Sequence, residues 1–166
     1  MSRLKSKNPI NFNNIKKKKS TLKRVPFTLS IPQSNAMTRQ MFEVDQYKLT
    51  EKSKWINEAI AQLLSCPHWL NIVEGVMLSQ REGKKELVTH MGELLKLDLD
   101  EACIDLKRKI ILGEVAATKS IISAVIRGAI MNRLDVNASS IANILSTGKH
   151  LIEKETDKES LKNNNQ

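Results

Sequence analysis

The sequence has little of what metal sites, disulfide frameworks and membrane spans require. Its 166 residues include two cysteines and three histidines, with neither a CxxC nor an HExxH motif, so a zinc site or disulfide framework lacks ligands. No apolar run approaches the roughly 18 residues of a membrane span, and no signal-peptide apolar segment follows the basic N-terminus. Aromatic residues make up only 4%, which favours an aliphatic, helical core. We therefore expect a small cytoplasmic protein without membrane insertion.

Acidic residues are absent from the N-terminal region, where the first one is Glu43. Residues 1–24 contain nine lysines and arginines, and the remaining 18 basic residues balance 18 acidic ones, so this arm accounts for the net charge of +9. A segment rich in Lys, Asn and Ser buries too little apolar surface to offset the entropy of ordering. We expect a disordered arm that binds a polyanion, nucleic acid being the commonest; a solubilising tail is the alternative.

The next region, residues 25–66, has the pattern of a strand followed by two helices. Val25–Ile31 alternates between apolar and polar residues, which predicts a strand closed by Pro32. A first helix is predicted from Ser34 to about Gln46, and Thr50 is the expected N-cap of a second helix that ends before Pro67. Beyond it, we expect a further helix and a polar linker across residues 67–93.

The same order recurs in residues 94–136. Leu95, Leu97 and Leu99 alternate with Lys96 and Asp98, which predicts a second strand. A helix capped by Asp100 and ended by Gly113 would follow, and then a helix that begins at Ala117 or Thr118. Leu29 and Leu97 lie 68 residues apart, and Ser53 and Ser120 lie 67 apart, so the two copies keep nearly the same register. A C-terminal helix (137–152) and a disordered tail (153–166) complete the predicted organisation.

Each copy resembles a ribbon-helix-helix unit, a small DNA-binding fold. The matching text is FTLSIP with SKWINEAI, and then LKLDL with SIISAVI. A lone strand leaves its backbone groups unpaired, so two units must pair their strands. The resemblance implies a mainly α fold with one short two-stranded antiparallel ribbon, formed within one chain as a pseudo-dimer. Such a ribbon fits the major groove of DNA.

The resemblance also implies which residues touch DNA. Outward strand residues would face the bases, and the first turns of the second helices would face phosphates together with the basic arm. The predicted base-contacting residues are Thr28, Ser30, Lys96 and Asp98. The predicted phosphate-contacting residues are Lys16, Lys17, Lys18, Lys19, Arg24, Thr50, Lys52, Ser53, Thr118, Lys119 and Ser120.

Tandem copies in one chain are similar to accessory proteins of conjugative DNA transfer, including TraY-like relaxosome proteins and the overdrive-binding protein of T-DNA transfer. By that resemblance the partners are double-stranded DNA and a relaxase or other transfer protein, and the chain is a folded monomer that associates further, if at all, on DNA. A transcriptional autoregulator or plasmid partition protein is the alternative within DNA binding. A helical protein–protein adaptor with a basic recruitment arm is the alternative of another class. No residue pattern indicates an enzyme or a cofactor.

Overall fold

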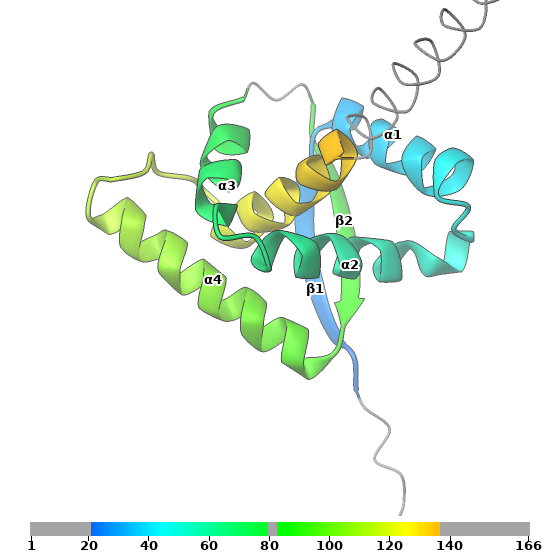
Figure 1. The fold of residues 1–166 in the computed structure, drawn as a ribbon, viewed down its shortest axis with the longest axis horizontal. Coiled ribbons are helices and arrows are strands. Elements are labelled where there is room, and N and C mark those ends of the chain that lie inside the picture. The colour runs from blue at the N-terminus through cyan, green and yellow to red at the C-terminus, as the bar shows by residue number, and fades with distance from the viewer. Residues whose placement is uncertain (1–20, 80–82, 137–166) are drawn as a thin grey trace, which may run out of the picture.

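The computed structural model describes residues 21–79 and 83–136. Within them, helices pack against one face of a two-stranded sheet (Figure 1). The strands are β1 (Lys23–Leu29) and β2 (Lys85–Met91), and between them lie helical elements and a linker. The prediction of a mainly helical protein with one short antiparallel ribbon is therefore confirmed. The C-terminal helix and both tails expected from the sequence lie outside the described residues, except for residues 21–24 of the expected arm, of which Lys23 and Arg24 belong to β1.

The ribbon pairs its two strands over their whole length. Lys23 lies opposite Met91 and Leu29 lies opposite Lys85, so Pro26 and Val88 face each other at the centre. Along each strand every second residue is buried beneath the helices, as the period of two requires. The buried residues are Val25, Phe27 and Leu29 on β1 and Leu87, Thr89 and Met91 on β2.

The first strand ends two residues earlier than the sequence predicts because Ser30 begins a helix. Its hydroxyl accepts a hydrogen bond from the Gln33 N–H (3.3 Å), and the Ser30 N–H donates to Gln33 Oε1 (3.2 Å). This reciprocal capping box starts α1 (Ile31–Arg39), with Pro32 in its first turn, where proline is tolerated. Ile31 is therefore 48% exposed and not part of the ribbon core. The helix continues as a π-helical turn, η2 (Gln40–Val44).

The second strand was predicted in the wrong place. Leu95, Leu97 and Leu99 lie within the helix α4 (Glu93–Ile111), and the strand is β2, inside the region expected to be a linker. Gly92 occupies the N-cap position of α4 directly after the strand. The end of this helix agrees with the prediction, since α4 stops at Ile111 and Gly113 follows with a φ of +73°.

The remaining helices follow the predicted order. A short 3-10 turn, η3 (Leu49–Glu51), leads into α2 (Lys52–Leu64), and α3 (Trp69–Leu78) comes after the break at Pro67. In η3 the helix entry is fixed by the Lys48 N–H, which donates to Glu51 Oε2 (2.8 Å), rather than by Thr50. A last helix covers 121–136, and the Ser120 hydroxyl caps it by accepting from the Ser123 N–H (3.3 Å).

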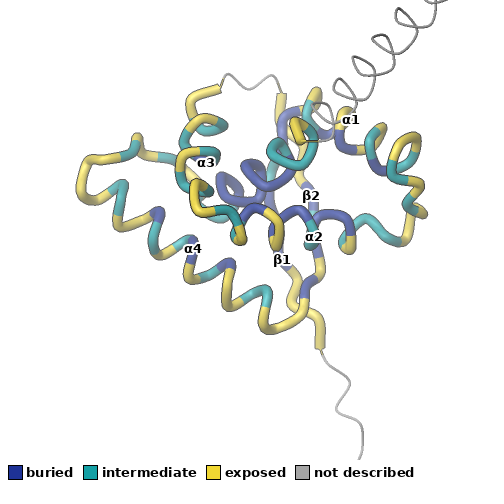
Figure 2. Tube along the Cα trace, in the orientation of Figure 1, coloured by how far each residue is buried: buried dark blue, intermediate teal, exposed yellow. Residues whose placement is uncertain are grey.

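The helix at 121–136 runs through the centre of the molecule. Residues 123–130 are all buried, so this helix is enclosed on every side, as the dark blue segment at the centre of Figure 2 shows. Gly128 permits the contact with α3, since a Cβ at that position would lie 2.8 Å from Val73 Cγ2. Arg133 joins the helix to α2 by donating to the Trp55 carbonyl (2.9 Å) while its guanidinium lies 4.5 Å from the centre of the Trp55 ring.

We predict that Phe27→Ala lowers the free energy of unfolding by about 3–5 kcal/mol, because the phenylalanine is 2% exposed and its removal leaves a cavity. Val88→Ala, on the opposite face of the ribbon, is the control and is expected to change stability by less than about 1 kcal/mol. Urea denaturation measures both. Similar losses of stability for the two variants would contradict the assignment of the ribbon's faces.

Candidate nucleic-acid interface

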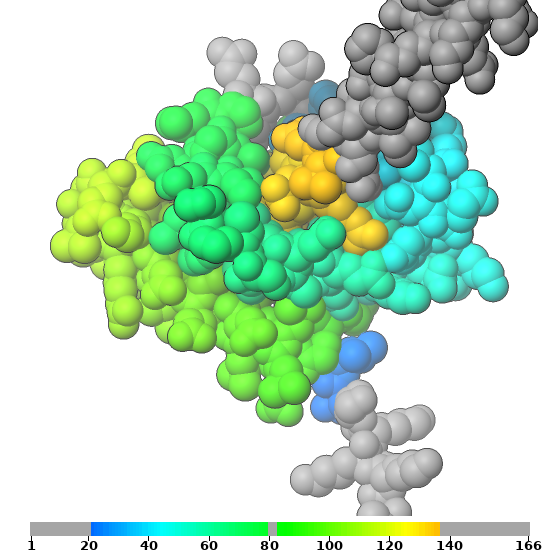
Figure 3. Space-filling view, viewed as in Figure 1, coloured from blue at the N-terminus to red at the C-terminus, as the bar shows by residue number. Residues whose placement is uncertain are grey.

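The ribbon face that turns away from the helices carries six side chains. These are Arg24, Pro26 and Thr28 of β1 and Glu86, Val88 and His90 of β2, each exposed or half-buried. They form three cross-strand pairs, in which Arg24 lies opposite His90, Pro26 opposite Val88 and Thr28 opposite Glu86. Five of the six, all but His90, line one shallow groove along this face. Figure 3 views the molecule from the helical side, and the N-terminal end of β1 is visible at the lower edge.

This face combines the groups that read base edges. Arginine donates to guanine, threonine pairs with several bases, and a glutamate accepts from cytosine. Val88, beside Pro26, supplies the apolar contact that suits a thymine methyl group. Hydrogen-bonding groups thus lie at both ends of the ribbon and apolar groups at its centre.

At the outer edge of each strand, a serine hydroxyl from a helix accepts a hydrogen bond from one backbone N–H. The Thr28 N–H donates to Ser123 Oγ (3.2 Å), and the His90 N–H donates to Ser53 Oγ (3.1 Å). Asn57, one turn further along α2, accepts from Thr89 Oγ1 and donates to the His90 carbonyl, both at 2.8 Å. The first turns of α2 and of the helix at 121–136 are therefore held against the two edges of the ribbon.

Of the four predicted base-contacting residues, the structure places only Thr28 on the outward face. Ser30 is 4% exposed and serves as the N-cap of α1. Lys96 and Asp98 lie on α4, where Lys96 forms an ion pair with Asp100. Their placement in the ribbon was wrong, for the same reason that the second strand was.

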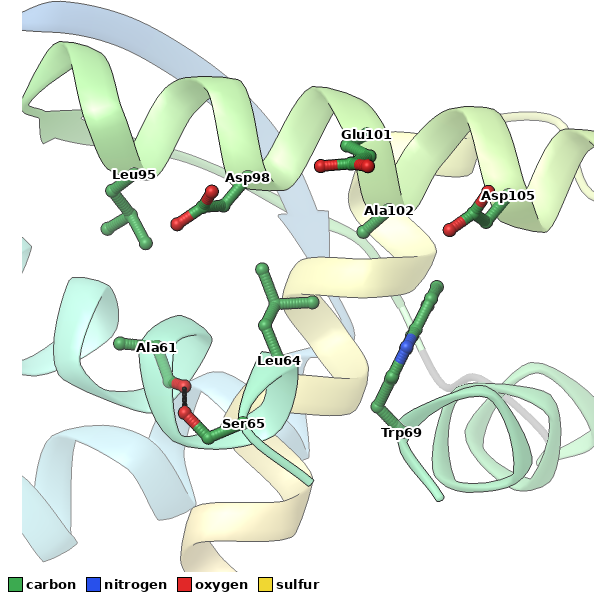
Figure 4. A pocket seen from close by; sticks show the side chains of 9 residues that line it. All are labelled: Ala61, Leu64, Ser65, Trp69, Leu95, Asp98, Glu101, Ala102 and Asp105. Atoms are coloured by element: carbon green, nitrogen blue, oxygen red, sulfur yellow. Dashed lines mark hydrogen bonds between the residues drawn. The ribbon is translucent and has the colours of Figure 1, made fainter. Parts of the chain in front are cut away.

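Asp98 lines a different hollow, between α4 and the C-terminal end of α2 (Figure 4). Leu95 and Asp98 of α4 point there towards Leu64 of α2. Glu101 and Asp105 line the same hollow. Three carboxylates repel phosphate, so this region does not suit a nucleic-acid backbone.

Three of the predicted phosphate-contacting residues lie near the end of the ribbon at which Leu29 and Lys85 pair. Thr118 and Lys119 line a groove with Thr28 and Lys84, just before the helix at 121–136. Lys52 is the first residue of α2, and its pKa is lowered by partial burial and, to a smaller extent, by the positive charge of Lys85. An anion placed between Lys52 and Lys85 would offset the repulsion between their positive charges.

The other predicted phosphate contacts have mixed placements. Thr50 lies in η3, and Arg24 is on the outward face of the ribbon itself. The hydroxyls of Ser53 and Ser120 already accept backbone N–H groups, from His90 and Ser123 respectively. Lys16, Lys17, Lys18 and Lys19 lie outside the described residues.

Five residues of this region were not predicted from the sequence: Ser123, Pro26, Glu86, Val88 and His90. One signal was available, because S-x-x-I-x-x-A-I occurs at 53–60 and again at 123–130, an identical pattern at a spacing of 70. It would have aligned Ser53 with Ser123 instead of Ser120. The strand at β2 gives a weaker signal, since its central inward residue is the polar Thr89.

Comparison of the chain with protein-family models, with curated proteins and with solved structures found no match. A function must therefore be inferred from the geometry of the ribbon and its flanking helices. Within residues 21–79 and 83–136 there is no group of three or more His, Cys, Asp or Glu side chains that could hold a metal ion. None of the helices described is long and apolar enough to cross a membrane.

We predict that Ser123→Ala lowers the free energy of unfolding by about 1–3 kcal/mol, because it leaves the part-buried Thr28 N–H without its acceptor. Ser53→Ala is expected to cost less, since water can reach the exposed His90 N–H. Ser65→Ala, which removes an exposed hydroxyl at the end of α2, is the control. Thermal or urea unfolding distinguishes the three, and equal effects for Ser123→Ala and Ser65→Ala would refute a role in sealing the strand.

Proposed function

We propose that this chain is a sequence-selective double-stranded DNA-binding protein, built from two ribbon-helix-helix units whose common ribbon enters the major groove. The observation that carries the proposal is the matched pair of strand-to-serine hydrogen bonds. Thr28 lies two residues beyond Pro26, and His90 lies two residues beyond Val88, the residue opposite Pro26. A twofold rotation about the ribbon centre thus exchanges Thr28 with His90, and it likewise exchanges their acceptors, Ser123 and Ser53.

The two units differ mainly in the length of their first helix. From Pro26 to Val88 the spacing is 62 residues, whereas from Ser53 to Ser123 it is 70. The 19 residues of α4 stand where the first unit has nine in α1 and five in η2. A longer first helix and a longer loop after it account for the change in spacing.

The charge distribution supports a polyanionic partner. The chain before β1 contains most of the lysine-rich arm, and Lys23 continues it into the ribbon. A strand that enters the major groove brings the chain preceding it close to the flanking phosphates. Lys84, Lys85 and Lys119 add positive charge at the opposite end of β1. The arm would supply salt-dependent affinity, and the ribbon would supply selectivity.

The two half-ribbons present different side chains. The twofold rotation relates Arg24 to Glu86 and Thr28 to His90, so equivalent positions carry different residues. A single chain should therefore prefer an asymmetric DNA site. The resemblance to tandem ribbon-helix-helix proteins suggests a site in a transfer-origin region, with a relaxase or another transfer protein as partner and no catalytic step by this chain. Footprinting on the plasmid or chromosomal region that carries the gene separates that role from autoregulation, because the latter protects a promoter.

Selection of bound sequences from a random DNA pool tests selectivity, and gel shifts on the selected site then test the ribbon. We predict that Thr28→Ala and His90→Ala each weaken specific binding by about 1–3 kcal/mol. The first removes a hydroxyl, and the second removes an imidazole with one donor and one acceptor nitrogen, and both kinds of group can bond to base edges. Binding to unrelated DNA should be unchanged. Lys96→Ala, on α4, is the matched control and should bind like the unaltered chain. Loss of selectivity in Lys96→Ala but not in the ribbon variants would reject the proposed reading surface.

The arm makes a separate contribution. Replacing Lys16, Lys17, Lys18 and Lys19 with glutamine should weaken binding to all DNA sequences alike, because phosphate contacts carry no sequence information. A plot of the logarithm of the association constant against the logarithm of the salt concentration should have a slope that is shallower by about 0.9 for each phosphate that is no longer neutralised. Titrations at several salt concentrations measure this. If these substitutions abolish all binding while the ribbon variants change nothing, a protein–protein adaptor with a basic recruitment arm becomes the better account.

A further inference from the structure

The helix α4 is apolar on two opposite sides. One side packs into the core through Leu99, Ala102 and Leu106, which are at most 5% exposed. The other side carries large apolar residues that remain open to solvent, and Figure 2 shows α4 with exposed turns along the outside of the molecule. These residues, here called the α4 stripe, are Leu94 (80% exposed), Leu97 (58%), Ile104 (52%) and Ile111 (73%).

The spacing of the α4 stripe is that of a helix–helix interface. Its residues follow one another at intervals of three, seven and seven, which places them at the a and d positions of a heptad. At about 100° per residue the stripe lies about 180° from the buried side, so the fold of the described chain cannot cover it. Four large apolar residues that recur on one side of a helix are typical of a packing interface, whereas singly scattered surface residues are not.

The two remaining positions of the same row carry opposite charges. Glu101 and Arg108 follow the heptad between the apolar residues, and both are exposed. Arg108 forms an ion pair with Asp105 of its own helix, at 3.6 Å. The row is therefore acidic in its first half and basic in its second.

We propose that the α4 stripe is the interface of a reversible homodimer, in which α4 of a second copy packs antiparallel to it. A twofold axis between Ile104 and Asp105 brings Leu97 beside Ile111 of the second copy, and Ile104 beside Ile104 of the second copy. Glu101 then lies level with Arg108 of the second copy, because the two residues are equally far from this axis along the helix. A parallel arrangement in register would instead oppose Glu101 to itself. The same twofold operation pairs three of the four apolar residues with apolar residues and the two charged residues with each other, which is why a second copy of this chain fits the row.

This dimer differs from the pairing of strands that forms the ribbon, because that pairing is complete within one chain. One helix pair buries little area, so we expect dissociation constants in the micromolar range and a folded monomer below it. Sedimentation equilibrium of the full chain without DNA tests this. Ile104→Glu should leave a monomer at all concentrations used, whereas Leu78→Glu, at a leucine of α3 that is 69% exposed, should dimerise like the unaltered chain.

Charge reversal tests the orientation. Glu101→Arg and Arg108→Glu should each raise the dissociation constant about tenfold or more, because each places like charges together across the twofold axis. The double variant E101R/R108E should restore dimerisation. A chain that is monomeric throughout, a dimer that survives Ile104→Glu, or a double variant that remains as weak as the single ones would each overturn the proposal. None of these residues lies on the ribbon, so a failure to bind DNA would leave this result unaffected.

Discussion

The pairing of β1 with β2 is the constraint on which the rest of the structure depends. Each strand has a single neighbour within the described chain, so its second edge requires other partners for its N–H groups. Ser123 and Ser53 each accept one such N–H, from Thr28 and His90, and in doing so they fix where the helix at 121–136 and α2 begin relative to the ribbon. Phe27 and Leu29 then bury their side chains against those helices. The outward face is left with side chains that are exposed or half-buried.

The sequence was sufficient to predict every element whose pattern has one periodicity. The first strand, α2 and α3 each bury one face, and their bounds agree with the pattern to within a few residues. The sequence was insufficient where a local hydrogen bond determines whether a residue extends a strand or begins a helix. Ser30 fits an outward strand position equally well as an N-cap, and only the reciprocal contact with Gln33 shows that it starts a helix.

The misplaced second strand has a more specific cause. In a helix with one apolar face, position 97 would carry a polar residue, and only Leu95 and Leu99 would be apolar in this stretch. Because α4 is apolar on two opposite sides, Leu97 on the outer side falls between Leu95 and Leu99 on the inner side, and the result imitates the alternation of a strand. The true strand was hidden by the opposite effect, since buried Thr89 interrupts its apolar row and is satisfied by Asn57 from a distant helix. The candidate site inherited this error through Lys96 and Asp98.

Joining two units in one chain, as proposed, removes a restriction that a homodimer obeys. In a homodimer every substitution occurs twice, so the two halves of the ribbon stay identical and both first helices keep one length. Here Arg24 and Glu86 occupy equivalent places, and α4 alone is extended. The difference between the two first helices also limits how many copies can associate through the α4 stripe. If both first helices carried such a stripe, each chain would offer two interfaces and could grow into longer assemblies. With one stripe per chain, antiparallel pairing of α4 closes after two copies.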